Sequence, residues 1–211
     1  MSILVEISEL LQKGRAPKVK ELVQQAIDQG ITPKDILEEG LLSGMNIIGE
    51  KFKNNEVFVP EVLIAARAMN AGIGILKPYL VAAGVESAGV AVIGTVKGDL
   101  HDIGKNLVKM MLESKGINVI DLGVDVSAQA FYDAAMEHGA KIVCCSALLT
   151  TTMNEMKNVV DLFVANGKRD DVKIMIGGAP VTQAFADSIG ADCYTTDATS
   201  AAEAALAFCK E

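Results

Sequence analysis

The fold is decided by residues 89–106, which read GVAVIGTVKGDLHDIGKN. Residues 89–95 form a short apolar run with β-branched side chains, which predicts a buried β-strand. The loop that follows carries Asp99 and His101, and an amphipathic helix is expected over residues 103–115. A strand, a polar loop and a helix in this order predict the first unit of an α/β sheet.

The same alternation continues to the C-terminus. Further strands are expected at residues 118–122, 142–146 and 173–176, with a weak one at 192–195. The helices between and after them are expected at 127–138, 153–166, 180–188 and 199–209. This pattern predicts a five-stranded parallel sheet of the Rossmann-like (flavodoxin-like) kind, with helices on both faces. Ligands of such sheets bind at the carboxyl ends of the strands, where the strand order reverses.

Upstream of this region the hydrophobic period changes to about 3.6 residues. Four apolar stripes run through residues 4–11, 19–27, 36–52 and 62–73, and they predict a four-helix bundle. Thr32 followed by Pro33 is typical of a helix start. We therefore expect an α/β protein with a helical domain at 1–83, a small-residue linker at 84–87 and a Rossmann-like domain at 88–211.

Composition excludes several classes of function. Of the 211 residues, 19 are Lys or Arg and 27 are Asp or Glu, which gives a formal net charge of −8. An acidic chain without a basic cluster is a poor binder of nucleic acid or anionic lipid. No uninterrupted apolar run reaches the ~20 residues of a membrane span. The four cysteines lack the spacing of a zinc site or a disulfide framework, so we expect a reduced, cytoplasmic protein.

The loop after the first strand concentrates the chemistry. Asp99 precedes His101 by two residues, so its carboxylate can accept a hydrogen bond from one imidazole nitrogen while the other faces outward. Gly98 and Gly104 let the backbone pass close to a bulky, flat ligand. The alternative is structural: Asp102 caps the next helix, and His101 is an ordinary loop histidine.

Two later loops supply weaker signals. Ser146, Thr150 and Thr152 follow the third strand and could line a polar cleft, or they could simply begin a helix rich in threonine. Gly177 and Gly178 follow the fourth strand and either make a tight turn or leave room for a ligand.

Taken together, these three loops resemble the cobalamin-binding fold. The signature of that family is Asp-x-His-x-x-Gly, then Ser-x-Leu, then Gly-Gly, and this chain has DLHDIG at 99–104, SAL at 146–148 and GG at 177–178. The helical half is similar to the cap domain of methionine synthase, in the stretches GMNIIGEKF at 44–52, VFVPE at 57–61 and AARAM at 65–69. Nearly the whole chain is covered, and the best match is the small corrinoid proteins of methyltransferase systems.

The resemblance implies a role for each matching residue. His101 would bind cobalt from below in place of the cofactor's own dimethylbenzimidazole base, Asp99 would be its hydrogen-bond partner, and Thr152 would stand where the third member of this relay is often a serine. Residues near the rim of the corrin ring would be Gly98, Leu100, Asp102, Ile103 and Gly104. Residues lining the slot for the displaced tail would be Ser146, Leu148, Thr150, Gly177 and Gly178, with Tyr194, Asp197 and Ala198 at its far wall. Cap residues over the upper face would be Met45, Phe52 and Val59, although a bundle core would also need apolar residues there.

The implied function is that of a methyl carrier, with cobalamin cycling between methylcobalamin and cob(I)alamin. The partners would be a substrate:corrinoid methyltransferase, a methylcorrinoid methyltransferase serving tetrahydrofolate or a thiol, and a reductive activase. Substrate choice belongs to the partner enzyme, so methylamine, methanol, glycine betaine and aryl methyl ether donors all stay open.

Three other functions compete with this one. A cobalamin-dependent sensor or regulator shares the two-part core but needs a DNA-binding domain. The small subunit of a carbon-skeleton mutase shares the histidine motif but normally lacks the helical cap. A nucleotide-binding α/β protein would be expected to carry Gly-x-Gly-x-x-Gly in the first turn after a strand, and this chain does not.

Overall fold

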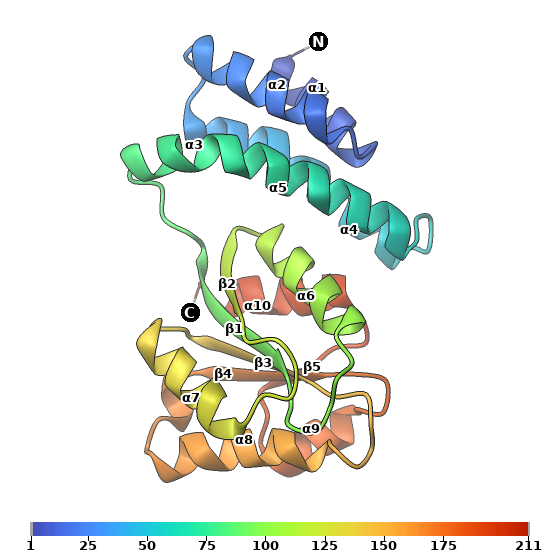
Figure 1. Cartoon of the computed structure of the whole chain (residues 1–211), viewed down its shortest axis with the longest axis vertical. Coiled ribbons are helices and arrows are strands. Elements are labelled where there is room, and N and C mark those ends of the chain that lie inside the picture. The colour runs from blue at the N-terminus through green and yellow to red at the C-terminus, as the bar shows by residue number, and fades with distance from the viewer. Residues whose placement is uncertain (1, 211) are drawn as a thin grey trace. The chain divides into compact units, whose positions relative to one another are not determined.

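The computed structural model describes residues 2–210, which divide between Glu86 and Ser87 into two compact units (Figure 1). We describe each unit by itself. Unit 1 is helical throughout and unit 2 alternates strands with helices, so the predicted change of architecture along the chain is confirmed.

Unit 1 is a bundle of four helical segments. Its elements are α1 (Ile3–Gln12), α2 (Ala16–Asp28), α3 (Pro33–Asp35), the π-helix η1 (Ile36–Leu42), α4 (Ser43–Lys53) and α5 (Val59–Ala82). The third segment begins as expected, because the Thr32 hydroxyl accepts a hydrogen bond from the amide of Asp35 at 3.1 Å. Ile7, Leu11 and Val23 are fully buried, as the apolar stripes require.

The third segment differs from the plain helix that the apolar period predicts. Residues 33–53 are helical throughout, but Ile36–Leu42 form π-helical turns. Two glycines here pack closely on α1: a Cβ added at Gly40 would lie 3.3 Å from Ile7 Cγ2, and one at Gly44 would lie 3.0 Å from the Ser8 carbonyl oxygen. The wider turn thus occurs where this segment packs closely on α1, and the local apolar pattern does not mark it.

Helix α5 has the length and composition that would allow a membrane span. Seven of its residues are buried, however, among them Val62, Met69 and Leu76, and α5 packs on α2. It is a core helix of unit 1. It also continues to Ala82, about two and a half turns beyond residue 73, where the predicted stripe ends.

Unit 2 is a five-stranded parallel sheet covered by helices. Its strands are β1 (Gly89–Thr95), β2 (Ile117–Asp121), β3 (Ile142–Ser146), β4 (Lys173–Gly177) and β5 (Cys193–Tyr194). Its helices are α6 (Ile103–Glu113), α7 (Ala128–Glu137), α8 (Asn154–Ala165), the short 3₁₀-helix η2 (Arg169–Asp171), α9 (Gln183–Ile189) and α10 (Ala198–Phe208). Helices α6 and α10 cover one face, and α7, α8 and α9 cover the other (Figure 1).

The strand order is β2-β1-β3-β4-β5, with every neighbouring pair parallel. The predicted flavodoxin-like sheet is confirmed. The chain turns from β1 to β2 on one side and then crosses to β3 on the other, so the order reverses between β1 and β3. Thr95, Ser146 and Gly177 are partners in register at the carboxyl edge. The three loops singled out in the sequence therefore start side by side at this edge.

Candidate functional site

A tight turn after β1 holds Asp99 in the loop at the carboxyl edge of the sheet. The amide of Asp99 donates a hydrogen bond to the carbonyl of Val96 at 3.1 Å. Gly98 has φ +79°, a conformation that residues with a Cβ rarely adopt. A Cβ at this position would make only ordinary contact with Thr152, so backbone conformation rather than space requires the glycine.

The Asp99 carboxylate is fully buried and is surrounded by hydrogen-bond donors. Its Oδ1 lies 2.7 Å from His101 Nδ1 and accepts from the His101 amide at 3.1 Å. Its Oδ2 accepts from the amides of Leu148 at 2.8 Å and Leu149 at 3.1 Å. Burial alone raises the pKa of Asp99, but the hydrogen bonds from His101, Leu148 and Thr152 outweigh it and hold the pKa well below its usual value.

The ionised carboxylate determines which nitrogen of the imidazole carries the proton. Because Asp99 can only accept, His101 Nδ1 must carry the proton of this short hydrogen bond. In the neutral imidazole, Nε2 then has a free lone pair, which is the state of a histidine ready to bind a metal. The His101 side chain is 51% exposed, so the second nitrogen is accessible.

Thr152 lies where the predicted third member of the relay should be. It is buried, and its hydroxyl oxygen is 2.8 Å from Asp99 Oδ2 and 2.9 Å from the carbonyl oxygen of Leu149. A hydroxyl has one proton, so it donates to one of these acceptors at a time. The threonine thus supplies a hydroxyl at the place where the resemblance implies one.

Thr95, which our reading of the sequence missed, anchors the same loop. It is the last residue of β1, is fully buried, and its hydroxyl donates to the carbonyl of His101 at 2.8 Å. The hydrogen bond ties the histidine backbone to the end of the strand. A polar residue that ends an apolar strand was the only signal for it in the sequence.

The loops after β3 and β4 are joined through their backbones. The amide of Ala147 donates to the carbonyl of Gly177 at 3.1 Å. Gly178 has φ +133°, and a Cβ there would overlap the Ala147 carbonyl, so only glycine fits. A Cβ on Gly177 would meet no atom within 4 Å. Of the predicted slot residues on these loops, Ser146 is partly buried, and Leu148 and Thr150 are exposed.

The last strand brings the remaining sheet-edge residues into place. Tyr194 pairs in register with Ile176 of β4 and is partly buried. Asp197 is the N-cap of α10 and accepts from both the amide and the hydroxyl of Ser200 at 2.8 Å. Ala198, next to it, is buried. The Asp197 carboxylate thus caps a helix, which the sequence pattern did not indicate.

Comparisons with known proteins identify the family of this chain. A family described as the B12 binding domain matches residues 89–206, and a second family of that description matches residues 3–77. The chain is 41% identical over 208 residues to a corrinoid protein of Desulfitobacterium hafniense, covering 97% of this chain and 96% of that protein. The chain belongs to the B12-binding corrinoid proteins. It is also 44% identical over 200 residues to the dimethylamine corrinoid protein of Methanosarcina barkeri, with 94% of this chain and 93% of that one covered.

A solved structure supports the same assignment to the corrinoid proteins. The crystal structure of the methanol:cobalamin methyltransferase complex MtaBC from Methanosarcina barkeri contains a chain with a TM-score of 0.89 and 31% identity. The match covers 99% of this chain and 80% of that chain. The cofactor of this corrinoid protein is accordingly cobalamin.

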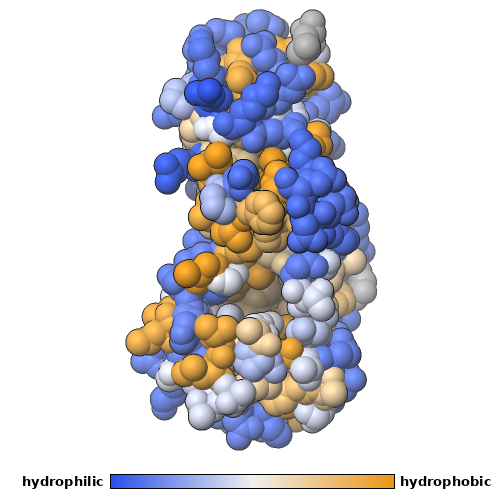
Figure 2. Space-filling view, turned by 90° about the vertical axis from the view of Figure 1, so that its right-hand side faces the viewer, coloured by the Kyte–Doolittle hydropathy of each residue, from blue (hydrophilic) through white to orange (hydrophobic). Residues whose placement is uncertain are grey.

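The surroundings of His101 fit a corrin ring. The imidazole offers a single nitrogen donor, which suits a metal ion whose other ligands come with the cofactor. Leu100 and Ile103, on either side of it in sequence, are 70% and 77% exposed, and Leu148 is also exposed. Figure 2 shows hydrophobic residues gathered on this face of unit 2. A Cβ on Gly104 would meet nothing within 4 Å, so space is open here as well.

The other predicted residues of the corrinoid site divide between the two units. Asp102 stands at the N-cap of α6 without a capping hydrogen bond from its side chain; instead its carboxylate accepts from Asn106 Nδ2 at 3.1 Å. In unit 1, Met45 is fully buried, and Phe52 and Val59 are partly exposed. The cofactor-facing role of these three residues stays a prediction.

Proposed function

We propose that the protein carries a methyl group on cobalt between two methyltransferases. The observation that supports this best is the contact between Asp99 and an exposed His101 at the point where the strand order reverses. When bound, cobalamin supplies a cobalt atom that accepts and gives up a methyl group. The first partner would be a substrate:corrinoid methyltransferase, since the similar proteins are named for dimethylamine and for a methanol:cobalamin methyltransferase complex.

The second partner in this proposal is a methyltransferase that passes the group to tetrahydrofolate or a thiol. A reductive activase would restore the cofactor after accidental oxidation. Neither step is assigned to a residue of this chain, because the site described above offers the His101 imidazole and an apolar rim. Its own contribution is to hold, orient and shield the cofactor.

The residues of unit 2 would hold cobalamin with its own base displaced and His101 in its place. Asp99 keeps the proton on Nδ1 and directs Nε2 outward. Leu100 and Ile103 would exclude water from the lower face of the ring. The nucleotide tail would lie along the residues of the three later loops, namely Ser146, Leu148, Thr150, Gly177, Gly178, Tyr194, Asp197 and Ala198.

Reconstitution tests this proposal directly. Purified protein is loaded with hydroxocobalamin, freed of excess cofactor and reduced to cob(II)alamin, whose electron paramagnetic resonance reports the nitrogen below cobalt. We expect near one-to-one loading, and the splitting should change when the protein is labelled with ¹⁵N-histidine. Retention of the splitting pattern of the unlabelled tail base would contradict the ligand assignment.

Two histidine variants complete the experiment. H101A should still bind cobalamin but transfer methyl groups poorly, because the lower ligand is lost. H138A is the matched control, since His138 is the other histidine of the chain and ends α7. An H101A protein with full turnover and an unchanged spectrum would show that the histidine is not the ligand.

A further inference from the structure

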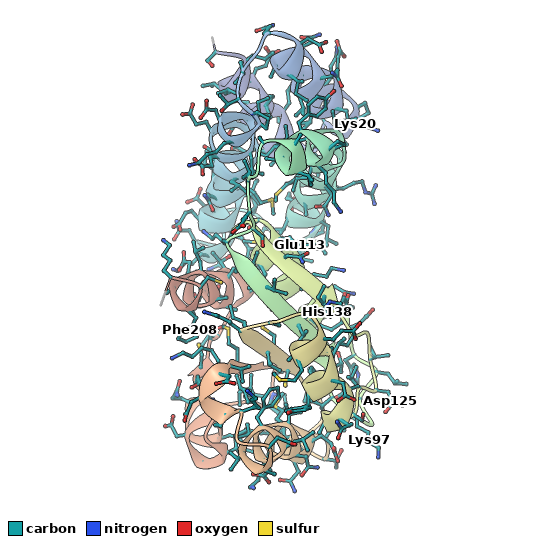
Figure 3. The ribbon with its side chains drawn as sticks, turned by 90° about the vertical axis from the view of Figure 1, so that its left-hand side faces the viewer. Lys20, Lys97, Glu113, Asp125, His138 and Phe208 are labelled. Atoms are coloured by element: carbon teal, nitrogen blue, oxygen red, sulfur yellow. The ribbon has the colours of Figure 1, made fainter. Side chains whose placement is uncertain are left out.

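A second loop runs beside the histidine loop and is bonded to it on both sides of the Gly98–Asp99 peptide. Asp125 lies between β2 and α7. Its Oδ1 accepts from the amide of Gly98 at 2.7 Å, and its own amide donates to the carbonyl of Asp99 at 3.0 Å. Figure 3 shows Asp125 and Lys97 at the same end of unit 2, with His138 at the other end of α7.

The backbone of Asp125 has an unusual conformation that suits this contact. Its φ is 56°, and within residues 2–210 Asn55 is the other non-glycine residue with positive φ. Left-handed backbone is unfavourable for most residues and easiest for glycine. Glycine at 125 would relieve the backbone but lose the carboxylate. Aspartate at this position thus keeps an acceptor for the Gly98 amide at the cost of a less favourable backbone conformation. Residues held at positive φ cluster at functional sites.

The loop that carries Asp125 is itself anchored to its neighbours. Thr95 donates from its amide to the carbonyl of Gly123 at 3.0 Å, and Val126 donates to the carbonyl of Thr95 at 2.9 Å. Gly123 in turn donates to Asp121 Oδ1 at 3.0 Å. Asp125 therefore reaches Gly98 from a fixed support that is hydrogen-bonded to β1.

We propose that Asp125 is a positioning residue for the cobalt ligand. Asp125 holds the peptide between Gly98 and Asp99 and so fixes the position of the Asp99 carboxylate relative to β1. The position of this carboxylate in turn sets the angle at which His101 presents Nε2. The inference rests on the proposed function, because it assumes that His101 binds cobalt. Asp125 itself touches neither the imidazole nor the Asp99 side chain in the hydrogen bonds described above.

Three variants separate the carboxylate from the backbone. D125N keeps an acceptor oxygen and tolerates positive φ, D125G keeps the conformation without the acceptor, and D125A lacks both. Each is loaded with hydroxocobalamin and reduced to cob(II)alamin, and the fraction with histidine nitrogen on cobalt is measured by electron paramagnetic resonance with ¹⁵N-histidine labelling. We expect D125N to match the wild type. D125G should load one-to-one but have its ratio of histidine-bound to histidine-free cobalt lowered about fivefold, the factor one hydrogen bond contributes.

The matched control is D192A. Asp192 also accepts a backbone hydrogen bond, from the amide of Ile174 at 2.6 Å, but at the amino end of β4. This variant should lose stability and leave the nitrogen splitting unchanged. An unchanged ratio in D125G, or the same loss in D125N as in D125G, would overturn the proposal. If D125G fails to fold, D125A takes its place; it lacks both the acceptor and the suitable conformation, and an unchanged ratio in D125A would overturn the proposal. A wild-type protein without any histidine splitting would instead refute the proposed function.

Discussion

At the scale of single residues, the site depends on the hydrogen bonds that the buried Asp99 carboxylate accepts. Five donor atoms lie within 3.1 Å of the Asp99 oxygens: two from His101, the amides of Leu148 and Leu149, and the Thr152 hydroxyl. A carboxylate is the side chain that can accept all of them, because both of its oxygens are acceptors. The same bonds join the loop after β1 to the loop after β3.

Asp99→Asn tests this arrangement. The asparagine side chain has one acceptor oxygen, and its NH₂ group takes the place of the other Asp99 oxygen. Buried donors that now bond to that oxygen would then face the NH₂ group without an acceptor. Each donor left unpaired costs about 1–3 kcal/mol. We therefore expect D99N to lower the free energy of unfolding of unit 2 by at least that amount, measured by urea denaturation of the cofactor-free protein. Thr152→Ser, which keeps the hydroxyl, should stay close to wild type; an equal loss in both variants would contradict this account.

The residues of this site differ in how far the sequence could reveal them. Asp99 and His101 are two residues apart in one loop, so their spacing permits the contact, and the placement after a strand with nearby glycines favoured it. Thr95 and Asp125 act through the backbone of that loop, from the end of a strand and from another loop. Such contacts exist only once the strands are in register, and no local pattern marks them.

At the scale of elements, α6 and β2 are joined by an ion pair between a buried lysine and a partly exposed aspartate. The Lys105 side chain is 2% exposed, and its Nζ lies 2.6 Å from Asp121 Oδ1 and 2.7 Å from Asn106 Oδ1. Lys109 adds a contact with Asp121 Oδ2 at 3.2 Å. A buried ammonium needs such partners because the loss of its hydration is costly.

The two halves of this pair should respond differently to substitution. Asp121→Asn leaves the Lys105 charge buried without its counter-ion, and we expect a loss of about 3 kcal/mol in the free energy of unfolding. Lys105→Met fills a similar volume without a charge and should be nearly neutral. The K105M/D121N double variant should recover most of the stability that D121N loses, in a urea-unfolding double-mutant cycle. Equal losses in the two single variants would argue against burial as the cause.

The same pair predicts how stability changes in acid. Burial raises the pKa of Asp121, but hydrogen bonds from Lys105, Gly123 and Lys109 outweigh it and lower the pKa below its usual value. A carboxyl group with a lowered folded-state pKa adds stability above its unfolded pKa of about 3.9 and loses it as the pH falls. The urea midpoint of unit 2 should thus begin to drop near pH 5 and keep dropping as the pH falls through about 3.9 toward the lowered pKa of folded Asp121. The urea midpoint of the K105M/D121N variant should fall less steeply with decreasing pH, because Asp99 alone of these two carboxylates still contributes. An identical slope in the variant and the wild type would show that Asp121 does not cause the loss of stability in acid.

Elements with their own sequence period were predictable. The observed bounds of β1 and β3 match the predicted strands, and α6 begins where the amphipathic pattern does. The π-helical turns at Ile36–Leu42 were missed, because the apolar period does not distinguish them from an α-helix; they include Gly40, which packs closely on Ile7 of α1. The strand order is set by pairing between distant segments, and fold-level rules rather than local pattern supplied it.

At the scale of the whole molecule, the division into two units determines how cofactor binding should affect stability. Each unit has its own buried core, with Leu11 and Met69 in one and Phe131 and Phe163 in the other. Unfolding of the cofactor-free chain should therefore proceed in two transitions. A ligand stabilises only the parts of the protein that bind it. The predicted role of Phe52 and Val59 as a cover over the cofactor makes a further prediction, that cobalamin raises the midpoints of both transitions.

The F52A/V59A double variant tests the role of unit 1. We expect cobalamin to raise the midpoint of unit 2 as in the wild type, while its effect on the midpoint of unit 1 shrinks, because the proposed cover has lost its side chains. Urea titrations with and without hydroxocobalamin, followed by circular dichroism and by the corrin absorbance, separate the two effects. Val5→Ala is the matched control, since Val5 is an exposed apolar residue on α1 of the same unit. If F52A/V59A kept the full cobalamin effect on unit 1, these residues would be ordinary bundle residues, and the cover over the cofactor would have to come from elsewhere in the chain.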